Sequence, residues 1–405
     1  MALEVIKKDG TVEGWNGEKI KEAVYKAAAR VNQYVEPDVL NKLVEKVHSC
    51  LIIDRDVPTK DLHKEVIHYL KYFGLTDVAN SYQEYRDYKN TYAKSFEKVK
   101  DEADNVLLLG DRENANFDSS LVSTKGSLIK GYLTKELYRQ FYLSKEEKEL
   151  TKRGDIYIHD MRDMLMGSVN CCLFDIGNVL RGGFSMSNVD YTEPTSVLSA
   201  LQVIGDITLV ATAQQFGGFS LSQLDMVLLP YCHKTLEKAY EHAKHSFPDA
   251  GRFAWIAYSK DTLKNELKQG FQSLELKLNT VPCSRGDFAF TTISFGCWNA
   301  PQWLGRYLTN KDLWILKEIC EAILTTRMNG HGENHKPVVF PKLVYLYEEN
   351  YLSAFQEARD VFELAIECSS KCMYPDFLSL TGDWAHSSVG KQYMENKQVV
   401  TPMGA

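Results

Sequence analysis

Long helical segments alternate with short strand-like segments in the second half of this chain. Residues 195–216 are small and apolar on nearly every side, which predicts a helix buried in a core. Residues 288–296 (FAFTTISFG) and 338–344 are apolar and β-branched, as is typical of buried strands, and a helical segment at 311–328 separates them. This alternation predicts an α/β barrel or open sheet, and not a β-sandwich. Further helices are expected at residues 125–153, 221–248, 255–278 and 354–373.

Residues 154–175 (GDIYIHDMRDMLMGSVNCCLFD) place polar and thiol side chains among apolar ones. Ile156 to Ile158 alternate like a short strand that leads to His159. Asn170 and the two cysteines that follow it lie in an apolar setting, so we expect a site sheltered from water. His159 could orient a substrate or satisfy a buried backbone carbonyl, and Cys172 is expected to pack in the core.

The composition excludes several classes of protein. The 405 residues, 44% hydrophobic and 25% charged, indicate a globular protein of two or three domains. A net charge of −7 does not favour a nucleic-acid-binding surface, and no run approaches the length of a membrane span. Nine cysteines without a signal peptide indicate a reducing compartment, so we expect a cytoplasmic protein. The cysteine spacing does not suggest a metal site.

The N-terminal residues predict a small separate unit. Residues 5–12 have the pattern of a hairpin with an Asp-Gly turn, and Asn16 is a plausible N-cap for the helix that follows. Helices are expected at 37–52, 59–73 and 78–98. A β-ribbon on a small helical bundle is too small for chemistry of its own, but it can bind a ligand.

Two segments of this unit, VIKKDGTVEGWNGEKI and VPTKDLHKEV, resemble in order and spacing the ATP-cone, the regulatory nucleotide-binding module of ribonucleotide reductases and of the repressor of their genes. The resemblance implies that ATP or dATP binds as an allosteric effector. The implied ligands are Lys7, Lys8, Glu13, Lys19, Thr59 and His63. Lysines can neutralise a triphosphate, and Thr59 and His63 lie one helical turn apart. The alternative is that the lysines form a solvated surface.

From about residue 110 onward the chain resembles the catalytic subunit of anaerobic (class III) ribonucleotide reductase, a glycyl radical enzyme. The matching stretches are ENANFDS, GDIYIHD, NCCLFD, QQFGGFSLSQLD, FAFTTISFG, VVFPKLV and ELAIECSSKCMYPD. The resulting domains are an ATP-cone at 1–95, a linker at 96–112 and the N-terminal part of the reductase domain at 113–405. The implied fold is α/β, with the β-ribbon and helical bundle of the cone followed by the first half of a ten-stranded glycyl-radical-enzyme barrel.

The resemblance also implies a chemistry. Ribonucleoside triphosphates are reduced at the 2′ carbon, with formate as reductant, after a thiyl radical abstracts the 3′ hydrogen. A glycyl radical generates the thiyl radical and is itself installed by an iron–sulfur activase that uses S-adenosylmethionine. A second cysteine on the barrel wall maps onto Cys171, and Asn170 is expected to bind substrate. Further pocket candidates are Asn114, Asn116 and His159. A homodimer or higher oligomer is expected.

The final residues depart from the family. Its radical cysteine lies in a Pro-Met-Gly-Cys motif, whereas this sequence has Pro402, Met403, Gly404 and then Ala405. The resemblance therefore predicts that this chain alone does not reduce ribonucleotides and needs a complementing C-terminal fragment. A split gene, an intein junction and a truncated sequence all remain open.

Two other functions compete with the reductase. A non-catalytic sensor of ATP and dATP would resemble the cone-containing repressor, but the chain lacks a zinc-ribbon cysteine quartet. Another glycyl radical enzyme, such as a relative of formate lyase, is disfavoured because those proteins carry no cone and because NCCLFD matches the reductase.

Overall fold

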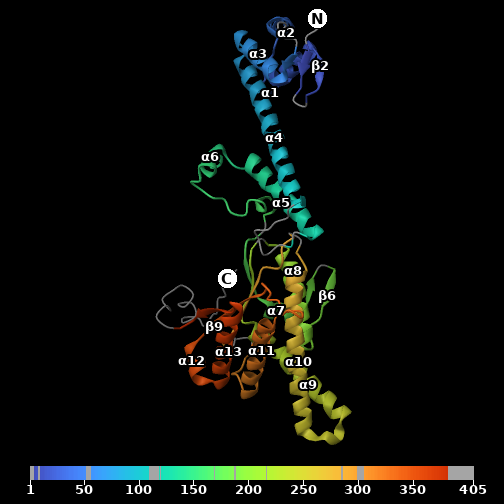
Figure 1. The fold of residues 1–405 in the computed structure, drawn as a ribbon, viewed down its shortest axis with the longest axis vertical. Helices are drawn as coiled ribbons and strands as arrows, with labels where there is room; N and C mark the ends of the chain where they lie inside the picture. Colours follow the sequence, from blue (N-terminus) through green and yellow to red (C-terminus); the bar gives the residue numbers. More distant parts are fainter. Residues whose placement is uncertain are drawn as a thin grey trace. The chain divides into compact units, whose positions relative to one another are not determined.

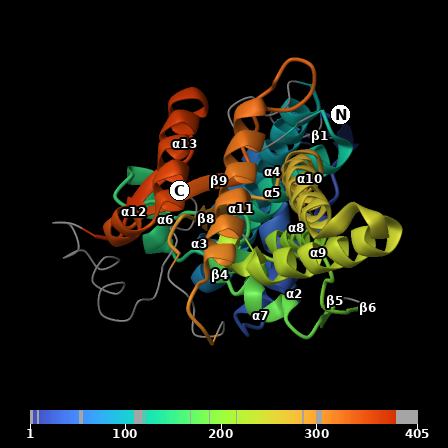
Figure 2. The ribbon, with the colours of Figure 1, turned by 90° about the horizontal axis from the view of Figure 1, so that it is seen from below.

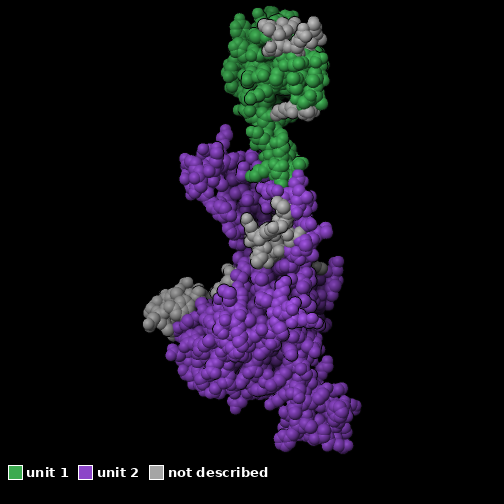
Figure 3. All heavy atoms as spheres, in the orientation of Figure 1, with its two compact units in different colours: residues 1–101 green, residues 102–405 purple. Residues whose placement is uncertain are grey.

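The computed structural model describes residues 4–7, 10–51, 56–108, 118, 120–167, 169–186, 188–215, 217–283, 286–298 and 305–381. The chain divides into two compact units, Met1–Asp101 and Glu102–Ala405 (Figure 3). The boundary between the two units falls within the expected linker at 96–112. Lys8, Asn114, Asn116 and the segment from Pro402 to Ala405 lie outside the described residues.

Three short strands form the sheet of the N-terminal unit, in the order β2-β1-β3. They are β1 (Glu4–Ile6), β2 (Val12–Gly14) and β3 (Asp56–Pro58). β1 runs antiparallel to β2 and parallel to β3, so the predicted hairpin is confirmed. Gly10 has a φ of +80°, the left-handed region that favours glycine in such a turn. The third strand went unpredicted because three residues are too few to show a period.

Four helices accompany this sheet in the residues that the structure describes: α1 (Gly17–Arg30), α2 (Pro37–Leu51), α3 (Thr59–Tyr72) and α4 (Thr76–Leu108). Asn16 caps α1 as predicted, because its side chain accepts a hydrogen bond of 3.0 Å from the Glu18 backbone N–H. Val24, Leu40 and Val66 are fully buried and join one apolar core. α4 continues to Leu108, ten residues beyond the expected end at 98, so most of the expected linker is helical.

A five-stranded, fully parallel sheet forms the centre of the second unit, in the order β10-β9-β8-β7-β4. Its strands are β4 (Cys172–Phe174), β7 (Phe219–Leu221), β8 (Thr291–Phe295), β9 (Lys342–Tyr347) and β10 (Asp376–Ser379). This confirms the α/β class, and five parallel strands are the number expected for one half of the barrel. β8 lies within its predicted segment, and β9 begins later than predicted. The other three strands are too short for their sequence pattern to reveal them.

Nine helices accompany this sheet in the described part of the unit. They are α5 (Val122–Phe141), α6 (Lys145–Arg153), α7 (Ile176–Leu180), α8 (Val197–Thr212), α9 (Leu224–Ser246), α10 (Gly251–Thr280), α11 (Asn310–Asn329), α12 (Glu349–Ala354) and α13 (Gln356–Cys372). α10 packs against α8, α9 and α11, and α11 packs against α13 (Figures 1 and 2). The buried side chains of these five helices and of β7, β8 and β9 form one core, as the apolar pattern of α8 predicted.

Short elements complete the second unit. The hairpin β5 (Phe184–Met186) and β6 (Val189–Tyr191) and the 3₁₀ turns η1 (Met164–Met166) and η2 (Pro248–Ala250) were not predicted. None of the helices that the structure describes is long and apolar enough to cross a membrane.

Two predicted elements differ in the structure. The helix expected at 125–153 is interrupted before Ser144, which caps the start of α6 by forming a capping box with Glu147. α6 then ends at Arg153, the expected end, with Gly154 as its C-cap. The strand expected at Ile156–Ile158 is wrong: this segment is irregular, and Tyr157 is 84% exposed. A strand needs a neighbour to pair with its backbone, and local alternation of side chains does not supply one.

A buried carboxylate joins the start of α9 to the end of β8. Asp225 is fully buried, and its Oδ2 accepts hydrogen bonds from the Gly296 backbone N–H at 2.9 Å and from Trp298 Nε1 at 3.1 Å. Its Oδ1 accepts from the Met226 N–H at 2.9 Å. Burial raises the pKa of Asp225 to about 6, although these donors favour the charged form.

This raised pKa predicts a pH-dependent stability. The folded protein binds the Asp225 proton more tightly than the unfolded chain, in which the pKa is about 4, so the free energy of unfolding should fall as pH rises from about 4 to about 6. Asp225→Asn should remove this slope and cost about 2 kcal/mol, because an amide nitrogen cannot accept these hydrogen bonds. Urea unfolding at several pH values measures both. Asp249→Asn, at the exposed turn after α9, should keep the slope; a slope that persists in Asp225→Asn would contradict the assignment.

Candidate functional site

The second unit contains a cavity of about 740 Å³ at one end of the parallel sheet. Cys171, Gly218 and Phe290 line it. Each of them is the residue directly before a strand: β4, β7 and β8 respectively. Because these strands are parallel, their amino ends meet at the same edge of the sheet. The pairing therefore brings together residues that are far apart in the sequence.

The thiol of Cys171 is held by backbone groups of the neighbouring chain segment. Its Sγ accepts a hydrogen bond of 3.2 Å from the Gly218 N–H, and the next residue, Cys172, donates its N–H to the Gly218 carbonyl at 3.0 Å. A parallel bridge between Val169 and Gln215 extends the pairing of β4 and β7 beyond the two strands. Cys171 is partly buried and faces the cavity.

Gly217 leaves just enough room for this arrangement. A Cβ atom on Gly217 would overlap Cys171 Sγ and lie 2.6 Å from Asn170 Oδ1. The Gly217 N–H also donates to the Asn170 carbonyl. Such a close approach requires a residue without a side chain, and here the approaching residues are Asn170 and Cys171, the two expected catalytic ones.

Gln215 fixes the turn that supports the thiol, a role that the sequence analysis missed. Its side chain is buried, and Nε2 donates to the carbonyls of Gly217 at 3.0 Å and Gly218 at 2.8 Å. The available signal was an amide side chain that precedes two glycines at the end of an apolar helix. A buried amide needs hydrogen-bond partners, and the glycine backbone supplies them.

Cys172 does not share the surroundings of Cys171. It packs against the apolar core, which agrees with the expectation from sequence. Burial raises the pKa of its thiol above the ordinary value, and the neighbouring Cys171 raises it further. Cys172 therefore remains a neutral thiol near pH 7.

His159 also lines the cavity, so the structure brings it together with Asn170 and Cys171. Its side chain is 71% exposed, and Nδ1 lies 2.5 Å from Asp160 Oδ2. The ring thus belongs to the wall of the cavity and not to the core.

The cavity has basic residues that the sequence analysis did not single out. Lys135 and Arg139 on α5 and Arg162 after Ile158 all line it. The sequence pattern of residues 125–153 predicts only a helix. The available signal was the spacing of four residues between Lys135 and Arg139, which places both on one face of a helix.

Four of the expected effector residues, Lys7, Glu13, Lys19 and Thr59, lie close together in the N-terminal unit. Glu13 pairs with Lys7, at 2.6 Å between Oε2 and Nζ, and with Lys19. The hydrogen bonds from Lys19 and Lys7 lower the pKa of Glu13 to about 2. Thr59 Oγ1 donates to the carbonyl of Ile6, the residue before Lys7, at 2.7 Å. The structure therefore places Thr59 next to the lysine cluster.

His63 lies one helical turn after Thr59 on α3. Its Nδ1 is 2.5 Å from the hydroxyl of Tyr82 on α4. This contact fixes the ring against α4.

Gly217→Ala should disturb the Cys171 thiol. The added methyl group would overlap the position of Sγ and displace the sulfur from the Gly218 N–H. The rate of Cys171 alkylation by iodoacetamide at neutral pH, measured by peptide mass spectrometry, should fall several-fold, because the methyl group crowds the sulfur and hinders attack by the reagent. Gly126→Ala, where an added Cβ has open space, is the matched control. An unchanged alkylation rate in Gly217→Ala would show that the contact is unimportant for the thiol.

Two family models match the chain. Residues 113–405 match the model described as anaerobic ribonucleoside-triphosphate reductase, and residues 3–91 match the ATP cone domain. These two matches together cover both compact units.

Curated relatives give the same result. The anaerobic ribonucleoside-triphosphate reductases of Salmonella typhimurium and Escherichia coli are each 30% identical over 388 residues, which cover 94% of this chain and 52% of the relative. The corresponding protein of Enterobacteria phage T4 is 32% identical over 295 residues, 72% of this chain and 44% of the relative. The chain thus spans about half the length of the curated relatives it matches.

Among solved structures, the anaerobic ribonucleotide reductase from Thermotoga maritima in complex with dATP and CTP is similar with a TM-score of 0.46 and 16% identity. The match covers 73% of this chain and 49% of that one.

Proposed function

Because the chain belongs to the anaerobic ribonucleoside-triphosphate reductase family, we propose that it forms the N-terminal part of an enzyme that reduces ribonucleotides to deoxyribonucleotides. The reductase model matches 293 of the 405 residues, from 113 to 405, and the ATP-cone model matches most of the remainder. The enzyme is an oxidoreductase, since its reaction replaces the 2′ hydroxyl group of the ribose with hydrogen.

Cys171 is the proposed working thiol of this chain. The observation that carries the proposal is its position: the sulfur faces a cavity large enough for a nucleotide, next to Asn170 and within the segment that matches the family. In this role Cys171 donates hydrogen during reduction at the 2′ carbon, and Asn170 hydrogen-bonds the substrate. A thiol that donates hydrogen needs no neighbouring cation to ionise it.

The radical steps involve further components. In our proposal formate supplies the reducing equivalents, and a glycyl radical installed by an S-adenosylmethionine-dependent iron–sulfur activase starts the reaction. A complementing C-terminal polypeptide, corresponding to the half of the relatives that this chain does not span, would supply the glycyl radical and the radical cysteine. Homodimers or higher oligomers are the proposed assembly.

The N-terminal unit is the proposed effector site for ATP and dATP. Lys7, Lys8 and Lys19 would bind the triphosphate, and Thr59 and His63 would contact the rest of the nucleotide. Glu13 supports this assignment because it holds two of the lysines within one cluster. An incoming phosphate group therefore competes with the Glu13 carboxylate for the same ammonium groups.

Nucleotide titration tests the effector site. Lys19→Ala and His63→Ala should each weaken the binding of ATP or dATP by about tenfold in isothermal calorimetry, since each removes one charged or polar contact. Lys26→Ala is the matched control, because Lys26 lies on the same helix and pairs with Glu22. Binding that survives in both variants at the original affinity would rule out this assignment.

Substitution of the thiol tests the catalytic proposal. In the complete reductase that contains this chain, with its activase and formate, Cys171→Ser should reduce deoxyribonucleotide formation by about a thousandfold or more, because a hydroxyl group does not donate hydrogen in radical chemistry. Cys172→Ala is the matched control and should retain most of the activity, since Cys172 packs against the core. Retained activity in Cys171→Ser would remove the residue from the mechanism.

A further inference from the structure

The cavity that contains Cys171 is also lined by basic residues, and the proposed chemistry gives them no role. Lys135 and Arg139 extend from α5, and Arg162 comes from the segment between α6 and β4. All three belong to the second unit, as does the thiol.

Two of the three cations belong to one face of α5, and the third lies across that face. Gly131, Lys135 and Arg139 follow one another at intervals of four residues, and this spacing aligns them on a helix. Gly131 makes room for the third cation, since a Cβ atom there would lie only 3.2 Å from Arg162 Cδ. Arg162 therefore lies across the same face.

The positive charge on this face is only partly balanced. Arg139 Nε lies 3.8 Å from Glu136 Oε2, and Arg162 Nε lies 3.3 Å from Asp163 Oδ2. For Lys135, no carboxylate in the part of the chain that the structure describes forms an ion pair. Two cations four residues apart repel each other on a helix, and a bound anion would relieve this repulsion.

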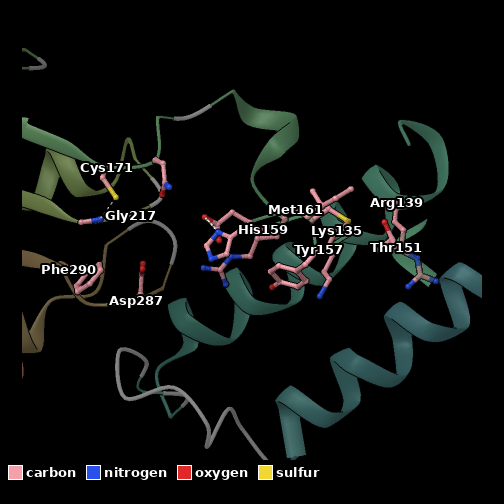
Figure 4. A pocket seen from close by; sticks show the side chains of 15 residues that line it. Lys135, Arg139, Thr151, Tyr157, His159, Met161, Cys171, Gly217, Asp287 and Phe290 are labelled. Atoms are coloured by element: carbon pink, nitrogen blue, oxygen red, sulfur yellow. Dashed lines mark hydrogen bonds and ion pairs between the residues drawn. The ribbon is translucent and has the colours of Figure 1, made fainter. Parts of the chain in front are cut away.

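The thiol end of the cavity has the opposite character. Figure 4 shows Asp287 and Phe290 on the same side as Cys171, with His159 between them and the side that holds Lys135 and Arg139. Asp287 is buried, and its Oδ1 accepts a hydrogen bond of 2.7 Å from the Cys283 thiol. A carboxylate at this end disfavours a phosphate group there, whereas Asp160, which also lines the cavity, lies 2.5 Å from His159 Nδ1.

We propose that Lys135, Arg139 and Arg162 bind the triphosphate of the substrate, and that the ribose consequently faces Cys171. This inference rests on the proposed function of the cavity and adds the orientation of the substrate within it. Guanidinium groups bind phosphate through paired hydrogen bonds, and an ammonium group adds a point charge. The volume of about 740 Å³ lies within the range of roughly 300–1,000 Å³ that is usual for ligand pockets.

Protection of Cys171 from alkylation tests the orientation without requiring turnover. The chain is treated with iodoacetamide at increasing concentrations of CTP or of cytidine, and modification of the Cys171 peptide is measured by mass spectrometry. Lys135→Ala and Arg139→Ala should each raise the half-protecting concentration of CTP by about tenfold, because a charged hydrogen bond to phosphate is lost. Protection by cytidine, which has no phosphate, should not change.

Three controls test whether a loss of CTP protection comes from the cavity itself. Lys130→Ala removes a lysine of α5 that does not line the cavity, and it should leave CTP protection unchanged. Arg139→Lys should restore part of the protection lost in Arg139→Ala. Repeating the series in Lys19→Ala removes the contribution of the effector site, and circular dichroism verifies that each variant is folded.

The outcomes separate the two proposals. If CTP protects the original chain and protects Lys135→Ala and Arg139→Ala equally well, the phosphate assignment is wrong while the substrate cavity stands. If CTP fails to protect Cys171 in the original chain, the cavity is not the substrate site, and both proposals are overturned.

Discussion

Parallel pairing between β4 and β7 is the constraint on which the candidate site depends. The pairing places Cys171 beside Gly217 and Gly218, and the Gly218 N–H then donates to the sulfur. Gln215 holds the carbonyls of the same turn, so a buried side-chain amide and a backbone amide together fix one thiol. The cavity opens at the amino ends of the strands because the sheet is parallel and these ends meet there.

The basic residues of the two units differ in whether a carboxylate pairs with them. In the N-terminal unit Glu13 already pairs with Lys7 and Lys19, so a triphosphate bound there would have to compete with a carboxylate. In the cavity Lys135 has no such carboxylate within the described ranges, so an anion can bind without displacing one. At equal concentrations of nucleotide, this difference favours anion binding in the cavity over anion binding beside Glu13.

Much of the fold followed from local patterns. The Asn16 cap, the hairpin turn at Gly10 and the helix end at Gly154 each depend on residues within one turn of each other, and all three are present. The strands β4, β7 and β10 were missed because each has only three or four residues. The prediction of a strand at Ile156–Ile158 was wrong, because the alternating side chains have no neighbouring strand with which the backbone could pair.

The sequence by itself determined the family, the α/β class and the ATP-cone unit, and it singled out Cys171 as a candidate, because each depends on motifs of contiguous residues. Only the tertiary structure decided that Gln215 and Gly217 support the thiol and that Lys135 and Arg139 share its cavity. Lys135 precedes Cys171 by 36 residues, and Gly217 follows it by 46. Strand pairing and helix packing set such distances, and no local pattern encodes which distant segments become neighbours.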